Sequence, residues 1–162
     1  MDYIWTPWRY HYIAEAGKIA GCVFCDAPAA KRDEETLLVL RGVQNYVILN
    51  RYPYTSGHVM IVPYAHTADF GHLDPETSAE IMRLAQRMQA ALDVVYHPEG
   101  YNLGMNLGRS AGAGIADHLH MHLLPRWTGD TNFMSTIGET RLEPEELSTT
   151  YAKLRQALGA IR

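Results

Sequence analysis

Residues 117–126 read Asp-His-Leu-His-Met-His-Leu-Leu-Pro-Arg, and this stretch guides the interpretation of the whole chain. His118, His120 and His122 alternate with apolar residues. Because successive side chains of a strand point to opposite faces, a strand here places all three imidazoles on one face. Three charged imidazoles side by side would repel one another, so at least some must be neutral at pH 7. Neutral imidazoles suit nucleophilic or general-base chemistry and metal ligation, and a polar cluster without chemistry is the plain alternative.

A glycine-rich loop at residues 108–114, Gly-Arg-Ser-Ala-Gly-Ala-Gly, directly precedes the histidines. Glycine lets backbone N–H groups come close to a ligand, and concave arrangements of N–H groups bind anions. Many glycine-rich loops are only turns, so the position of this one gives it its interest. A nucleophile beside an anion site predicts phosphoryl or nucleotidyl transfer.

The other apolar segments predict an α+β fold with a mostly antiparallel sheet, one main helix and a C-terminal helix. Strands are expected at residues 36–41, 46–50, 58–63, 101–107 and 118–126. The main helix is expected to have Asp74 as N-cap and Pro75 in its first turn, and to end before Pro98. The C-terminal helix is expected to open near Pro144 and to use apolar positions from 147 to 158.

Composition predicts one globular domain over residues 1–162, with an N-terminal arm (1–35) and a C-terminal helical extension (136–162). The 162 residues are 47% hydrophobic, and the net charge is −4. That charge argues against a nucleic-acid partner but is compatible with a small anionic ligand. Neither a signal-peptide pattern nor an apolar run of membrane-spanning length is visible, so we expect a cytoplasmic protein without membrane association.

Two cysteines, Cys22 and Cys25, form a C-x-x-C pair in the arm. Such a pair supplies half of a tetrahedral zinc site. A redox pair and two simply packed thiols are the alternatives. A redox pair usually opens a helix after a strand, and the sequence does not display that pattern here.

The histidine stretch resembles the histidine triad (HIT) superfamily, whose signature alternates three histidines with apolar residues as residues 118–124 do. Residues 49–63 resemble the family's nucleotide-binding strand and turn. Within the family, three segments are similar to the bacterial diadenosine tetraphosphate phosphorylase branch: residues 5–7, 106–114 and 125–134. The resemblance implies a HIT-like fold, a homodimer whose sheets join, and a dinucleoside polyphosphate or other nucleotide as substrate.

The resemblance also implies roles for individual residues. It makes His120 the nucleophile, places His122 against the reacting phosphate, and makes His58 a supporting histidine. It places Asn50 at the ribose hydroxyls and Asn106 near the phosphates or leaving group. Ile48, two residues before Asn50 on the same expected strand, is expected to pack on the base.

The loop departs from the pattern of many family members, because Ala113 and Gly114 stand where polar side chains usually contact the phosphate. Arg109, Ser110 and backbone donors at Gly112 and Gly114 must then bind the phosphate instead. This departure weakens any transfer of hydrolase-type leaving-group chemistry and leaves the nucleophile unaffected.

The resemblance further suggests that His66 and His118 complete a closed Cys2His2 structural zinc site with Cys22 and Cys25. Such a site would commit a lone pair of His118 to the metal. The other histidines, His11, His72 and His97, are expected at the surface or at caps. The tryptophans, Trp5, Trp8 and Trp127, are expected in core or dimer packing rather than base stacking.

Four functions follow from these residues. The first is phosphorolysis of diadenosine tetraphosphate to ATP and ADP through a nucleotidyl-histidine, with inorganic phosphate as second substrate. The second uses the same site with water, as a hydrolase of dinucleoside polyphosphates or nucleoside phosphoramidates. The third is a nucleotide-binding protein without catalysis, and the fourth is a zinc-dependent hydrolase with an open metal site.

Overall fold

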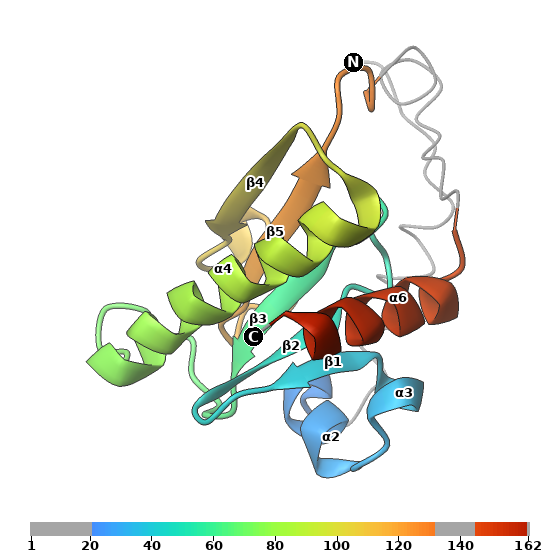
Figure 1. Cartoon of the computed structure of the whole chain (residues 1–162). Helices are drawn as coiled ribbons and strands as arrows, with labels where there is room; N and C mark the ends of the chain where they lie inside the picture. Colours follow the sequence, from blue (N-terminus) through green and yellow to red (C-terminus); the bar gives the residue numbers. More distant parts are fainter. Residues whose placement is uncertain (1–20, 132–144, 162) are drawn as a thin grey trace.

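A five-stranded antiparallel sheet forms the centre of the protein, in a computed structural model that describes residues 21–131 and 145–161 (Figure 1). The strands lie in the order β1-β2-β3-β5-β4. Their bounds are β1 Leu38–Arg41, β2 Asn45–Leu49, β3 Val59–Pro63, β4 Gly100–Met105 and β5 Met121–Arg126. The expected α+β class and antiparallel sheet are confirmed. Trp5, Trp8, His11, Pro144 and the motif residues 5–7 and 132–134 lie outside the described residues, and the single-domain organisation stays a prediction.

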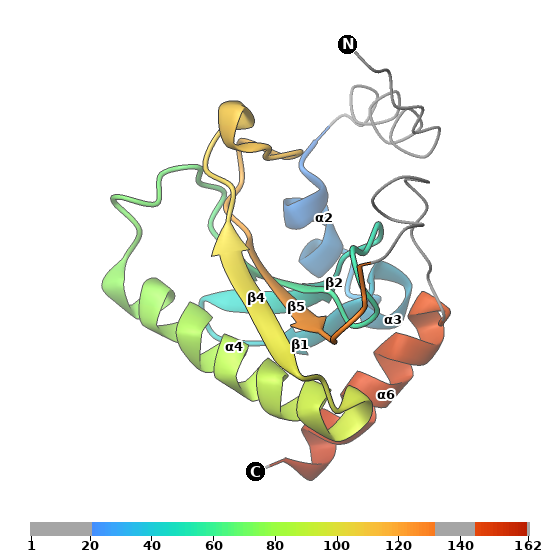
Figure 2. The same ribbon diagram turned by 90° about the horizontal axis from the view of Figure 1, so that it is seen from above.

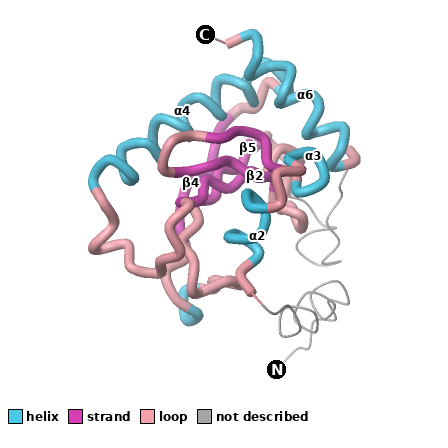
Figure 3. The backbone as a smooth tube through the Cα atoms, turned by 90° about the horizontal axis from the view of Figure 1, so that it is seen from below, coloured by secondary structure: helices cyan, strands magenta, loops and turns pink. Residues whose placement is uncertain are grey.

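Helices cover both faces of the sheet (Figures 2 and 3). On one face lie α4 (Pro75–Tyr96) and α6 (Leu147–Ala160), over a core that includes Val47, Ile61 and Leu123. On the other face lies the short α2 (Val23–Ala29). Strands β2 and β3 are buried at every position because side chains of both faces are covered.

The main helix begins as its sequence predicts. The Asp74 carboxylate accepts the N–H of Thr77 at 3.1 Å, and Pro75 occupies the first turn. His97 ends the helix in a left-handed conformation with φ of 47°, which confirms its expected place at a cap. Within the described residues, no helix has the length and apolar character needed to cross a bilayer.

The arm and the first strand differ from expectation. Residues 33–36 form a short helix, α3 (Asp33–Thr36), and Leu37 caps it at φ 62°, so β1 begins at Leu38 rather than at 36. Acidic side chains in the first turn favour this helix over the extended form. The expected arm contains α2, and α6 begins at Leu147.

The histidine strand is shorter than predicted. Strand β5 begins at Met121, so His118 and His120 precede the ladder and only His122 lies within it. The Leu119 N–H donates instead to the Thr67 carbonyl at 2.7 Å, beyond the end of β3. His122 still pairs with Met60, whose side chain packs with Phe24 of α2. The histidines therefore lie on the α2 face, opposite α4 and α6.

Candidate functional site

His120 is held in one tautomer by the backbone just before it. The residue is 7% exposed, and its ring Nδ1 lies 2.9 Å from the His118 carbonyl oxygen. A carbonyl can only accept a hydrogen bond, so Nδ1 carries the proton and donates. In the neutral ring the lone pair must then lie on Nε2. The main chain of the triad itself therefore orients this ring.

His58 and His122 form a hydrogen-bonded pair of imidazoles beside His120. The backbone N–H of Tyr54 donates to Nδ1 of His58 at 3.1 Å, so the His58 proton lies on Nε2. That Nε2 is 2.8 Å from Nδ1 of His122, which must accept. Neutral His122 therefore carries its proton on Nε2 and offers an N–H donor. The His120 and His122 rings meet edge to face, with 5.0 Å between their centroids.

All three triad rings are kept neutral by their surroundings. Burial lowers the pKa of His120, and the hydrogen bond to the His118 carbonyl opposes this only in part. Burial also lowers the pKa of His122 to about 4, with a further contribution from His120. For His118, burial again lowers the pKa, helped by His66 and His120 and opposed by the Pro63 carbonyl. The expectation of neutral imidazoles at pH 7 is confirmed in direction.

The depressed pKa of His122 predicts acid sensitivity of the fold. Above pH 6.5 the ring is neutral both folded and unfolded, so it contributes nothing. As the pH falls from 6.5 to about 4, the unfolded chain takes up a proton that folded His122 refuses, and stability declines. We expect His122→Gln to reduce the difference in proton uptake between the unfolded and folded states by up to about one proton in this range.

The measurement is the pH dependence of the unfolding free energy from urea titrations of wild type and variant. Both proteins carry the same candidate metal ligands, so acid release of a metal cancels in the comparison. His97→Asn removes an exposed imidazole at a left-handed position that asparagine tolerates, and should keep the wild-type slope. Equal slopes for His122→Gln and wild type would contradict the prediction.

The glycine-rich loop forms a single turn, η1 (Arg109–Ala111), between two glycines with positive φ. Gly108 has φ of 81° and Gly112 has φ of 91°, which suits residues without a Cβ. The N–H groups of Ala111, Gly112 and Ala113 donate to carbonyls of Gly108 and Arg109 within the loop. These three groups hold the loop together, so donors to an anion must come from its other residues. Arg109, Ser110 and Gly114 are exposed and accessible to a ligand.

The other nucleotide-site candidates lie on neighbouring elements. Asn50 follows β2, donates its N–H to the His58 carbonyl, and accepts the N–H of Tyr52 with its side chain. Ile48 is buried on the α2 face in a cluster with Phe24. The Asn106 amide nitrogen lies 3.9 Å from the point where a Cβ on Gly112 would stand. Asn50 is therefore next to the histidines, and Asn106 is next to the loop.

A second cluster brings Cys22, Cys25, His66 and His118 together. Their donor atoms all lie within 4.8 Å of one another. The His118 Nδ1 is 3.3 Å from the Cys22 sulfur and 3.6 Å from the Cys25 sulfur, and His66 Nδ1 is 3.4 Å from the Cys25 sulfur. Zinc–sulfur and zinc–nitrogen bonds at a tetrahedral angle separate their ligand atoms by about 3.6 Å. The donor set therefore fits a tetrahedral ion.

The surroundings of the four candidate ligands also support a zinc site. The His118 Nε2 lies 2.9 Å from the Pro63 carbonyl, so it carries the proton and leaves the Nδ1 lone pair directed at the sulfurs. Desolvation raises the pKa of the Cys25 thiol and the nearby Cys22 raises it further, an effect that a bound cation would reverse. The pair does open a helix, a feature of redox pairs that the sequence did not reveal, but its sulfurs face two imidazoles. Four protein ligands leave no position for a metal-bound water, which argues against the open zinc hydrolase.

Two residues of the site were not predicted from the sequence. Phe24 lies between the two cysteines on α2, and its ring centroid is 4.9 Å from that of His120. The backbone of Tyr54 sets the tautomer of His58. The sequence offered a weak signal for Phe24, an aromatic residue inside the C-x-x-C pair. It offered none for Tyr54, because a main-chain donor has no residue signature.

Comparisons with known proteins agree with this geometry. The HIT domain family model matches residues 31–129. The AP-4-A phosphorylase of Mycobacterium tuberculosis is 41% identical over 158 residues, covering 93% of this chain and 80% of the relative. The adenosine 5'-monophosphoramidase of Schizosaccharomyces pombe is 31% identical over 110 residues, covering 65% of this chain and 74% of the relative. A zinc-bound histidine triad family protein from Mycobacterium smegmatis matches with a TM-score of 0.71 at 29% identity, covering 86% of this chain and 94% of that one.

Proposed function

Because the chain belongs to the HIT domain family, we propose that it transfers a nucleotidyl group through His120, in the phosphorolysis of diadenosine tetraphosphate to ATP and ADP. The observation that carries the proposal is the 2.9 Å contact between His120 Nδ1 and the His118 carbonyl. It leaves the Nε2 lone pair as the nucleophile, beside the N–H donor of His122. The relative named AP-4-A phosphorylase supports the choice of substrate and of phosphate as acceptor.

The first step forms a P–N bond and breaks a P–O bond. The Nε2 lone pair of His120 attacks the α-phosphorus, and ATP leaves with the bonding electrons. The adduct ring is cationic, and its Nδ1–H still donates to the His118 carbonyl, which stabilises that charge. The Nε2–H of His122 donates to a phosphate oxygen, and His58 keeps that proton on the correct nitrogen.

The second step reverses the bond changes with a different acceptor. An oxygen of inorganic phosphate attacks the adduct phosphorus, the P–N bond breaks, and the electron pair returns to His120 Nε2. The product is ADP. Asn50 binds the ribose hydroxyls and Ile48 borders the base, while Asn106, Arg109, Ser110 and the backbone N–H of Gly114 bind the phosphates. The expected donor at Gly112 is not used, because its N–H donates to the Arg109 carbonyl.

Product analysis tests the acceptor. Incubation with diadenosine tetraphosphate should give ATP and ADP in equal amounts, and only when inorganic phosphate is present. AMP and ATP formed without phosphate would instead support the second candidate, a hydrolase. The similarity to an adenosine 5'-monophosphoramidase favours that alternative, so adenosine 5'-phosphoramidate should be assayed in parallel.

We also propose that Cys22, Cys25, His66 and His118 hold a structural zinc ion. Bound there, the ion would cross-link α2, the segment after β3 and the triad, without supplying a Lewis acid to the substrate. The zinc-bound neighbour and the close donor set support this.

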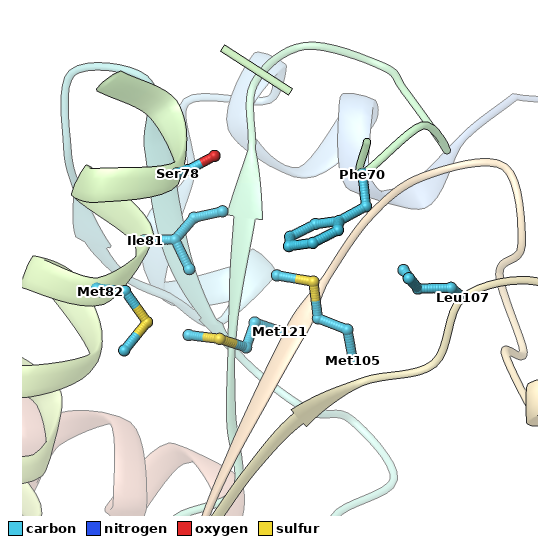
Figure 4. Close-up of a pocket in the computed structure, with 7 residues that line it drawn as sticks. All are labelled: Phe70, Ser78, Ile81, Met82, Met105, Leu107 and Met121. Carbon is cyan, nitrogen blue, oxygen red and sulfur yellow. The ribbon is translucent and has the colours of Figure 1, made fainter. Parts of the chain in front are cut away.

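We further propose a homodimer formed through the β4 edge of the sheet. Leu103 on β4 is 46% exposed, and β4 is the outermost strand on that side. An apolar hollow of about 350 Å³ lies nearby on the α4 face. Figure 4 shows Met105 and Met121 in it, between Met82 of α4 and Leu107. An exposed strand edge next to an apolar hollow favours pairing with a second copy.

Leu103→Asp should convert this dimer to monomer. The two-fold axis of a dimer would bring the new carboxylate of each copy into the interface, so we expect the dissociation constant to rise at least about 100-fold. Sedimentation equilibrium measures it. Val43→Asp is the control, because Val43 is an exposed hydrophobic residue (82%) at the opposite end of the sheet. A monomeric wild type, or an unaffected Leu103→Asp dimer, would contradict the proposal.

A further inference from the structure

We propose that Phe24 and His118 are positioning residues for His120, and that metal binding at the Cys2His2 cluster fixes both of them. The inference rests on the proposed function for its consequence in catalysis. Its structural part, the coupling between the metal cluster and the orientation of the His120 ring, stands on the contacts alone.

His118 takes part in both clusters with different atoms. Its ring Nδ1 faces the sulfurs of Cys22 and Cys25 at 3.3 and 3.6 Å. Its main-chain oxygen accepts the Nδ1–H of His120 at 2.9 Å. Any shift of the His118 ring that moves its backbone therefore moves the acceptor that holds the nucleophile in its tautomer.

The sheet ladder does not fix this backbone. Strand β5 begins at Met121, and its pairing with both β3 and β4 ends at that residue. Ahead of it, the Leu119 N–H bonds to the Thr67 carbonyl and the His118 ring bonds to the Pro63 carbonyl. The carbonyl of His118 thus lies three residues outside the ladder. It is anchored by the Leu119 N–H of the same peptide unit, which bonds to Thr67, and by the ring contacts of His118.

Phe24 provides a second connection. Helix α2 has seven residues, too few to be stable without tertiary contacts. Its sulfurs at Cys22 and Cys25 are the ligands it contributes to the metal cluster. The Phe24 side chain between them is 4% exposed, with its ring centroid 5.5 Å from that of His118 and 4.9 Å from that of His120. A metal ion that holds α2 therefore also holds Phe24 against the nucleophile.

The position of the His120 ring affects the rate of nucleophilic attack. A nucleophile displaced by about 1 Å can lose about 100-fold in rate, because attack requires alignment with the phosphorus. Without the ion, α2 loses two of its attachments, and both the carbonyl and the aromatic ring beside His120 gain freedom. The His120 ring is then expected to populate both neutral tautomers, and only one of them has its lone pair on Nε2.

The first test uses full-length protein labelled with ¹⁵N-histidine, depleted of metal by a chelator and then titrated with zinc. Long-range ¹⁵N–¹H spectra report the tautomer of the His120 ring without any substrate. We expect mixed tautomers in the metal-free protein and the Nδ1–H form on zinc addition. Single-turnover formation of the radiolabelled nucleotidyl adduct should rise about 10- to 100-fold in parallel.

Variants separate positioning from folding. Phe24→Ala with one zinc bound should keep its zinc affinity within about threefold, yet form the adduct about 10-fold more slowly. Val23→Ala, the neighbouring partly exposed position on α2, is the matched control and should match wild type in both. If removal of zinc unfolds the protein, as circular dichroism would reveal, the zinc-loaded Phe24→Ala comparison still decides the question.

The outcomes are distinguishable. A single Nδ1–H tautomer of His120 with and without zinc in folded protein, or an unchanged adduct rate in zinc-loaded Phe24→Ala, would overturn the inference. Absence of any adduct in zinc-loaded wild type would overturn the proposed function instead, and the tautomer spectra would still test the coupling.

Discussion

Replacing His120 by glycine is expected to abolish the nucleotidyl adduct and to lower kcat for diadenosine tetraphosphate by at least about 10³-fold. The reason is specific to the geometry, because the Nε2 lone pair of His120 is the group aimed away from the hydrogen-bonded Nδ1. Neither of the other two triad rings combines a free Nε2 lone pair with a hydrogen-bonded Nδ1–H. His122 uses Nδ1 to accept from His58, and the Nδ1 lone pair of His118 faces the cysteine sulfurs.

The measurement combines acid-quenched trapping of radiolabelled adduct with phosphate-dependent turnover. Glycine leaves a cavity of imidazole size, so added imidazole should restore part of the turnover while the adduct label leaves the protein. His72→Ala removes an exposed imidazole and should have no effect on either measurement. Adduct formation by His120→Gly at the wild-type rate would mean that another residue is the nucleophile.

The sequence predicted the parts of this site that depend on side-chain identity and spacing. Alternation of His118, His120 and His122 with apolar residues indicated a shared face and neutral rings, and the structure has both. The four expected metal ligands, brought together from three separate parts of the chain, followed from the family resemblance. The order and register of the strands were not predicted, because both depend on contacts between segments far apart in the sequence.

What could not be predicted depends on main-chain groups and on tertiary contacts. The Tyr54 N–H and the carbonyls of Pro63 and His118 set three imidazole tautomers, and no residue type identifies such groups. The start of β5 at Met121 results from the Leu119 contact with Thr67, which overrides a continuous β pattern in the sequence. A buried acidic residue on α4 was missed for a similar reason, since its partners are backbone N–H groups 35 to 37 residues earlier.

That residue, Glu80, carries the largest expected effect on stability. The residue is 8% exposed, and its carboxylate accepts the N–H groups of Val43, Gln44 and Asn45 at 2.7, 2.7 and 2.8 Å. The Asn45 side-chain amide donates a fourth bond at 2.8 Å. Burial alone would raise the pKa of Glu80, but these bonds outweigh it and hold the pKa below its ordinary value. The carboxylate therefore ties the turn before β2 to the main helix.

Glu80→Ala should lower the unfolding free energy by about 3 to 5 kcal/mol, because the N–H groups of Val43, Gln44 and Asn45 lose their acceptor and the buried Asn45 amide keeps only the Thr77 carbonyl. Urea denaturation followed by circular dichroism measures the change. Glu76→Ala, on an exposed turn of the same helix, is the control and should stay within about 0.5 kcal/mol of wild type.

A comparison of wild type with Glu80→Gln tests how the contribution of the carboxylate to stability depends on pH. A carboxyl whose folded pKa is depressed adds stability above its unfolded pKa and loses it as the pH falls through the folded value. The wild-type advantage over Glu80→Gln should therefore shrink below about pH 4.5 and be constant above it. Two results would contradict these predictions: a stability advantage over Glu80→Gln that stays the same down to pH 3, or a loss of unfolding free energy in Glu80→Ala no larger than in Glu76→Ala. Either would mean that water replaces the carboxylate and that the turn does not depend on it.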